Sequence, residues 1–315
     1  MAWVTWRQHR PQLLWLAGLL VVVACAALGT DLPIRSAYHR HALASCLPPA
    51  TRSGCELIVS HFRAEFAPLR SAARYLVVLP VLAGLFVGAP LLAREYEHGT
   101  FRLAWTQGIT RRRWLLGKTA LLGLVVVAAG LAFSGLAAWW RGPFDSVDGR
   151  IQPAAFDLEG VVVAGYAFFA LCAGVLAGVV FRRTIPAMTA AAAAFLAARI
   201  GVEKGLRPHY LAPLHRTAGG LAPQAPTRQW VLGDHLVDSL GRQSGAARED
   251  LAVAHAQHAG IDPQEYLVSL GWRRLITFQP DGRFWTFQAI ELGIFVALGL
   301  LAIGAAVALV RRAPG

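Results

Sequence analysis

Six apolar runs, each long enough to cross a lipid bilayer, constrain this chain more than any other feature. Of its 315 residues, 56% are hydrophobic and only 15% are charged, whereas a soluble domain carries about 25% charged residues. A spanning helix needs about 20 apolar residues and satisfies its backbone hydrogen bonds internally. We therefore predict an all-α polytopic membrane protein with six transmembrane helices. The expected spans are residues 13–29, 75–93, 114–140, 158–181, 184–202 and 284–310.

The distribution of Lys and Arg predicts the orientation of the spans, since cytoplasmic loops carry the excess of basic residues. If the N-terminus lies inside, the inside segments hold 12 basic and two acidic residues, and the outside loops hold 17 basic and 15 acidic residues. Both termini are therefore expected to be cytoplasmic. The sequence pI of about 10.5 then reflects basic loops that face anionic lipid, and nucleic-acid binding is not expected.

The two longer outside segments are expected to be helical. Residues 203–283 form an insertion between the fifth and sixth spans, in which we predict a small helical extracellular cap. Its helices are expected around Trp230–Leu240, over Ala246–His258, and from Asp262-Pro263, where an N-cap precedes a proline. In the first outside loop, Thr30–Arg74, a helix is expected through Glu56–Arg70.

The four cysteines divide by location. Cys25 and Cys172 lie within spans, where a thiol is usually a small packing residue. Cys46 and Cys55 lie in the first outside loop, in a compartment that permits disulfides. These two residues form either a bridge across a short loop or two free thiols.

The residues do not support other common signatures. Gly117-Lys118-Thr119 lacks the first glycine of a phosphate-binding loop, whose place is taken by Arg112, and it begins a transmembrane helix instead of following a strand. Lys118 is expected to snorkel to the interface. A cleaved signal peptide is not favoured, because the residues after Cys25 are still apolar. The histidine pairs His39/His41 and His255/His258 have no convincing further zinc ligands, so no metal site is expected.

Two charged residues lie within the spans: Arg199 near the end of the fifth and Glu291 about two turns into the sixth. An intramembrane charge is by default a functional hypothesis. The two residues could line or gate a pathway. Alternatively, if these spans are adjacent, they could form an ion pair that locks two helices together.

The basic loop 94–113 between the second and third spans has helical features of its own. Glu95 and Glu97 fall early in a short segment with Arg102 after them, which suits the helix dipole. Gly108 can end that segment, and Thr110 can cap the next helix. An amphipathic segment of this kind can dock in a groove of a partner. Alternatively, the loop is only topogenic: its basic residues set the orientation of the spans, and its aromatic residues anchor it at the membrane interface.

Three motifs, in order along the chain, resemble the actinobacterial permease subunits of type-2 ABC exporters. The first is Trp3-Val-Thr-Trp-Arg-Gln-His-Arg10. The second is Glu95-Tyr-Glu-His-Gly-Thr-Phe-Arg-Leu-Ala-Trp-Thr-Gln107, with Arg111, Arg113, Trp114 and Lys118 after it. The third precedes the last span and includes Phe278-Gln-Pro280, Arg283-Phe-Trp-Thr-Phe-Gln288 and Glu291.

The resemblance implies a single transmembrane permease domain over residues 1–315, in a bacterial plasma membrane. It implies that Trp3–Arg10 is an amphipathic helix at the inner membrane face, and that loop 94–113 is a coupling loop that docks a separate ATP-hydrolysing subunit. No cofactor is expected in this chain, and ATP and Mg would bind the partner ATPase. A second copy, or a similar permease, would complete an exporter of a small or amphipathic substrate. The alternative is a membrane-embedded sensor or enzyme component without transport activity. The positions that match the coupling segment are Glu95, Glu97, Gly99, Thr100, Arg102 and Gln107.

Overall fold

The computed structural model describes residues 2–47, 54–97, 110–219, 228–238 and 241–312. The fold is mostly helical, and six helices in it are long and apolar enough to cross a membrane, which confirms the prediction of six spans. The spanning helices are α1 (Ala2–Arg40), α4 (Val78–Glu97), α6 (Arg111–Asp148), α8 (Val162–Phe181), α9 (Thr184–Ile200) and α12 (Phe284–Arg312).

Several helices extend well beyond the apolar runs that predicted them. The backbone of Trp3–Arg10, expected as a separate interfacial helix, is continuous with the first span in α1. Thr110 is the N-cap of α6, as predicted, and its hydroxyl accepts a hydrogen bond from the Arg113 N–H (3.4 Å). In contrast, α8 begins at Val162 instead of at the predicted residue 158.

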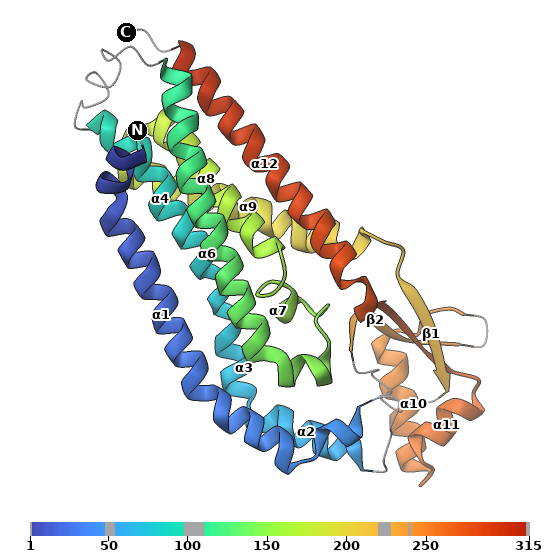
Figure 1. Cartoon of the computed structure of the whole chain (residues 1–315). Coiled ribbons are helices and arrows are strands. Elements are labelled where there is room, and N and C mark those ends of the chain that lie inside the picture. Colours follow the sequence, from blue (N-terminus) through green and yellow to red (C-terminus); the bar gives the residue numbers. More distant parts are fainter. Residues whose placement is uncertain (1, 48–53, 98–109, 220–227, 239–240, 313–315) are drawn as a thin grey trace.

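The two termini lie at one end of the helix bundle, and the cap lies at the other (Figure 1). The end of α4 lies next to the turn between α8 and α9, because Glu97 contacts Thr184, the first residue of α9. This arrangement is consistent with three helical hairpins in which both chain ends lie on one side of a membrane.

Helix α8 lies at the centre of the bundle and packs closely on α4 through glycines of both helices. Gly84 and Gly88 of α4 face the backbone of α8, and Gly174 and Gly178 of α8 face the backbone of α4. A Cβ atom on Gly174 would lie only 2.7 Å from the Ala89 nitrogen. Each pair is spaced four residues apart, the spacing that brings small residues onto one helix face and lets membrane helices approach closely.

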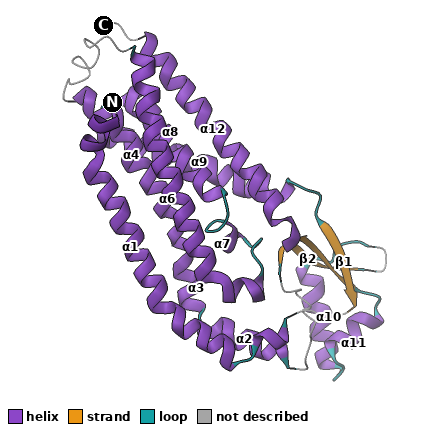
Figure 2. Ribbon diagram, viewed as in Figure 1, coloured by secondary structure: helices purple, strands orange, loops and turns teal. Residues whose placement is uncertain are grey.

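The cap is not purely helical, and the structure corrects that prediction (Figure 2). It contains a three-stranded antiparallel sheet of β1 (Leu214–Gly219), β2 (Gln229–Val237) and β3 (Arg273–Pro280), in the order β1-β3-β2. The helices predicted over Ala246–His258 and from Pro263 are present as α10 (Ala246–His258) and α11 (Pro263–Ser269).

The helix predicted around Trp230–Leu240 is wrong, because β2 occupies Gln229–Val237. Its cluster of Trp, Val and Leu suits a strand as well as a helix face, and short apolar runs do not separate the two. The strand is selected by its partner: Trp230 lies opposite Gln279, and Val237 lies opposite Arg273 of the central strand. A bulge between Val231 and Gly233 interrupts the register.

Short elements connect the spans at the cap end. The helix predicted through Glu56–Arg70 is present as two pieces, α2 (Cys55–Glu65) and α3 (Ala67–Ala73). A disulfide bond joins Cys46 to Cys55, and Cys25 and Cys172 are free. The remaining elements are α7 (Pro153–Phe156), a π-helix over Gly201–Leu206, and 3₁₀ turns over Leu43–Cys46, Arg74–Val77, Arg207–His209 and Asp281–Arg283.

Candidate functional site

The last turn of α4 carries two carboxylates, and each of them binds another spanning helix. Glu97 accepts hydrogen bonds from the backbone N–H of Thr184 (2.9 Å) and from its hydroxyl (2.8 Å). Thr184 is the first residue of α9, so Glu97 satisfies a donor that the first turn of a helix leaves without an internal partner. Its negative charge also lies at the positive end of the helix dipole. Glu97 thus connects the end of α4 to the beginning of α9.

Glu95 forms an ion pair with Lys118 of α6. The Lys118 side chain is 8% exposed, and its ammonium lies 4.7 Å from the centre of the Trp114 ring. The Lys118 amine, which was expected to snorkel to the membrane interface, is thus paired with a carboxylate in the last turn of α4. In addition, the Arg182 guanidinium lies 5.5 Å from the centre of the Tyr96 ring. The end of α4 is thus bound both to α6 and to the turn before α9.

The remaining residues assigned to the coupling segment lie in the interval 98–109, outside the described residues. They are Gly99, Thr100, Arg102 and Gln107. The docking role of this segment therefore stays a prediction. What the structure adds is the set of contacts made by Glu95 and Glu97, at the point where the chain leaves α4.

A buried polar cluster surrounds Glu291 of α12. Glu291 is fully buried, and Arg207, which is 1% exposed, donates to its two oxygens from Nη2 (2.6 Å) and Nε (2.8 Å). The Tyr166 hydroxyl of α8 donates to one oxygen, and the Tyr210 hydroxyl donates to the other (3.1 Å). Burial raises the pKa of Tyr210 above its usual range, and the charge of Glu291 raises it further, so this phenol remains a donor.

Asp157, between α7 and α8, completes this Glu291 cluster. It accepts from Arg207 Nη2 (2.8 Å) and forms an ion pair with Arg199. Arg199 Nη1 lies 3.4 Å from Glu203 and 3.8 Å from Glu291. Two acids and two arginines therefore balance each other inside the protein, with Glu203 at the margin. Breaking such a set by removing one member is costly, because it leaves an uncompensated buried charge.

The structure brings Arg199 and Glu291 together, but each has a closer partner that sequence reasoning missed. The nearest acid to Arg199 is Asp157, and the nearest base to Glu291 is Arg207. Arg207 was assigned to the outside insertion because the apolar run ends near Val202. A π-helix over Gly201–Leu206 continues the fifth span and carries Arg207 back to the bundle. Single-turn π segments occur often at functional sites.

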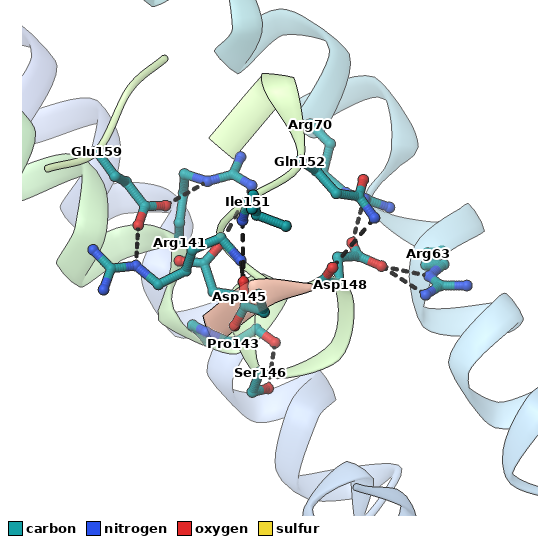
Figure 3. Close-up of polar contacts among 12 residues, drawn as sticks. Arg63, Arg70, Arg141, Pro143, Asp145, Ser146, Asp148, Ile151, Gln152 and Glu159 are labelled. Atoms are coloured by element: carbon teal, nitrogen blue, oxygen red, sulfur yellow. Dashed lines mark hydrogen bonds and ion pairs between the residues drawn. The ribbon is translucent and has the colours of Figure 1, made fainter. Parts of the chain in front are cut away.

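A second polar cluster lies at the cap end of α6, around Glu159 (Figure 3). Glu159 is fully buried and accepts from Arg141 Nε and from Arg150 Nε, each at 2.9 Å. Arg141 also donates to Asp145 (3.3 Å), one turn further along α6. Arg150 in turn lies over the Phe284 ring, 4.2 Å from its centre. This Glu159 cluster joins the end of α6 to the beginnings of α8 and α12.

Asp148, the last residue of α6, ties the first outside loop to the bundle. It accepts from Arg63 Nε of α2 (2.7 Å) and forms an ion pair with Arg70 of α3. At the beginning of α8, the buried Gln288 of α12 accepts from the Val162 N–H (2.8 Å) and donates to the carbonyls of Phe156 and Glu159 (3.0 Å each). Side chains of α2, α3, α6 and α12 therefore hold the short connections at this end.

The chemistry of these clusters is that of structural attachment. The acids of the Glu291 and Glu159 clusters accept hydrogen bonds from arginines or tyrosines at short range. Carboxylates that are bonded in this way are poorly placed to act as a general base or a nucleophile. Within the described ranges, no group of three His, Cys, Asp or Glu side chains is arranged to hold a metal ion.

Part of the chain matches a known protein family. Residues 17–207 match the family described as ABC-2 membrane transporter related. This interval begins within α1 and ends at Arg207, so it covers most of the first and fifth spans and all of the three spans between them. It includes the α4 carboxylates and all of the Glu291 cluster except Tyr210 and Glu291 itself. A search of curated proteins gives no match.

Proposed function

The chain belongs to the ABC-2 membrane transporter related family, and from this premise we propose that it is the permease subunit of an exporter of small or amphipathic substrates. A separate ATP-hydrolysing subunit would dock on loop 94–113 and would bind the ATP and Mg. The setting of Gly117-Lys118-Thr119 supports this division of labour. These residues lie inside α6, and the Lys118 amine is paired with Glu95, so they cannot form a phosphate-binding loop.

The observation that carries the proposal is the attachment of the α4 end to two other spans. A movement imposed on the segment 98–109 would reach α9 through Glu97 and Thr184, and would reach α6 through Glu95 and Lys118. We therefore assign Glu95 and Glu97 to transmission within the permease. Contact with the ATPase is assigned to the matching positions beyond them, Gly99, Thr100, Arg102 and Gln107.

The proposed mechanism is a shift between inward- and outward-facing states. Two permease chains, either two copies or this chain with a similar one, would carry two ATPase subunits in a bacterial plasma membrane. ATP binding would close the ATPase pair and move the coupling loops, which changes the relative stability of the two states. The contacts of the Glu291 cluster support a structural role, in which Arg199 and Glu291 hold α8, α9 and α12 together so that these helices move as one body. They do not favour a role for these two residues in lining a transport pathway.

The test separates docking from transmission. The tagged chain is purified from its native host in mild detergent, and co-eluting proteins are identified by mass spectrometry. A stoichiometric soluble ATPase with a Walker-type phosphate loop is expected. We expect Arg102→Glu to lose this partner, and Glu97→Ala to retain it. With Glu97→Ala, the ATP-dependent change in distance between labels on α9 and α6 is expected to disappear.

The control is Asp250→Asn, which changes an exposed acid of α10 at the opposite end of the molecule and is expected to preserve both properties. If no ATPase co-elutes in several detergents, even after cross-linking, the permease assignment fails. The alternative, a membrane-embedded sensor or enzyme component, is then favoured. If Glu97→Ala leaves the distance change intact, only the transmission role of Glu97 fails.

A further inference from the structure

An apolar cavity of about 400 Å³ lies between α1, α3, α4 and α6. Val23 and Ala26 of α1 form one wall, and Phe133 and Ala137 of α6 form another. The few polar side chains at its border already have partners. The Thr30 hydroxyl donates to the Ala26 carbonyl (2.9 Å) and accepts from the Trp140 indole (2.9 Å), and Arg141 is bonded to Glu159 and Asp145.

A second, much smaller space of about 10 Å³ lies next to the cavity along the same helices. The two spaces share Leu19, Val23, Leu79 and Phe133, and the smaller space reaches Leu16. Thr30 and Leu16 are 14 positions apart on α1, which is about 21 Å at 1.5 Å per residue. The whole groove is thus long and narrow, and it runs parallel to the spans.

We propose that this groove binds one acyl chain of a bilayer lipid. An empty apolar space stays dry and loses dispersion contacts on its walls, so a flexible apolar occupant is favoured. Because the bordering polar groups are already paired, a polar ligand would gain no hydrogen bond there. The groove lies between spanning helices, where lipid is the available apolar solvent.

The dimensions separate an acyl chain from a helix of a second copy. A helix with its side chains is about 10 Å across, so a 21 Å length would occupy roughly 1,600 Å³. The cavity holds about 400 Å³, which is too small for a helix and suits a chain that is one methylene wide.

The direction of the bound lipid follows from the charges on α1. Asp31 directly follows Thr30 and forms an ion pair with Arg35 one turn further along, and Arg35 Nη2 donates to the Trp139 carbonyl (3.2 Å). Charged side chains therefore begin at the Thr30 end, whereas the Leu16 end is lined by apolar residues. The lipid head group lies at the Thr30 end, in the leaflet on the cap side, and the terminal methyl points toward Leu16.

The experiment uses the full chain in nanodiscs of phosphatidylethanolamine and phosphatidylglycerol. A trace of phosphatidylethanolamine carries a diazirine near the end of one acyl chain, and mass spectrometry maps the photo-adducts. Adducts are expected on the groove-lining residues of α1 and α6. Ala137→Phe and Ala26→Phe fill the groove from opposite walls, and each is expected to reduce these adducts about tenfold, equivalent to 1.4 kcal/mol.

The matched control is Ala132→Phe, the same substitution at an exposed position of α6 outside the groove, which is expected to leave labelling unchanged. Only variants that elute like the wild type in size-exclusion chromatography are used. Because two variants fill the groove from opposite walls, the test still holds if one of them fails to fold. Equal labelling in all variants, spread over the exposed Leu124 and Leu131 of α6, would overturn the proposal in favour of bulk lipid. Absent labelling, with cross-links between copies at Ala26, would overturn it in favour of a protein contact. The assay involves no ATPase, so its result does not depend on the proposed function.

Discussion

Removal of the Glu291 carboxylate is expected to be the most destabilising single change in the Glu291 cluster. Glu291 is fully buried and accepts two hydrogen bonds from Arg207, at 2.6 and 2.8 Å, and one from each of Tyr166 and Tyr210. Hydrogen bonds to charged groups contribute about 1.5–3 kcal/mol each, so the two Arg207 bonds alone contribute roughly 3–6 kcal/mol. A second estimate of the same loss comes from buried ion pairs, in which removal of one member costs about 3–5 kcal/mol. We therefore expect Glu291→Met to lower the free energy of unfolding by about 3–5 kcal/mol.

The assay is reversible unfolding in mixed detergent micelles, followed by the fluorescence of the ten tryptophans. The double variant Glu291→Met/Arg207→Met removes both charges and leaves Asp157 paired with Arg199. Because apolar replacement of a whole buried pair is often close to neutral, we expect the double variant to be more stable than the single one. The double-mutant cycle then gives the coupling energy directly.

The control is Glu203→Ala, whose side chain is 34% exposed and lies 3.4 Å from Arg199. A partly exposed pair of this kind is worth about 0–1 kcal/mol. The reasoning would be refuted if Glu291→Met cost less than about 1 kcal/mol. It would be refuted equally if the double variant lost as much as the two single variants together, since the charges would then act independently.

Two further predictions concern packing and the disulfide. Gly174→Leu places a side chain against the backbone at Ala89 and is expected to lower the unfolding free energy by about 1–3 kcal/mol in the same assay. Gly293→Leu, with no atom within 4 Å of its Cβ position, is the control, and an equal loss there would refute close α4–α8 packing as the cause. Cys46→Ser opens a bridge between residues nine positions apart, which by loop entropy lowers stability by about 2.6 kcal/mol. Thermal unfolding with and without reductant measures this, and Cys25→Ser, at an exposed free thiol, is expected to have no effect; a wild type insensitive to reductant would contradict the prediction.

Local sequence patterns were sufficient for the spans and for some of their ends. A run such as Phe284–Val310 is too apolar for water and too long for a buried strand, so its transfer into lipid as a helix follows from composition alone. The N-cap of α6 also follows from local sequence, because Thr110 and Arg113 are three residues apart. Local patterns do not predict the strand β2 in the insertion between the fifth and sixth spans, since its partner strand β3 begins 36 positions after Val237.

The candidate site was found only in part. The sequence alone shows charged residues near or within the predicted spans, and these are Glu95, Glu97, Arg199 and Glu291. Their partners were not visible, because Thr184 is 87 positions from Glu97 and Arg207 is 84 positions from Glu291. A search for every acid and base just outside the apolar runs would have included Asp157 and Arg207.

The sequence by itself determined that the chain crosses a membrane six times, because the transfer of each apolar run into lipid depends on the residues within that run. The tertiary structure decided which charges meet, because a charge finds its partner only after the helices have packed at a particular rotation and depth. The glycine contacts between α4 and α8 fix that packing, and the π-helix before Arg207 sets the position of its guanidinium. The Glu291 cluster forms only where α8, α12 and the end of the fifth span meet, since an unpaired charge in that interior would be too costly to keep.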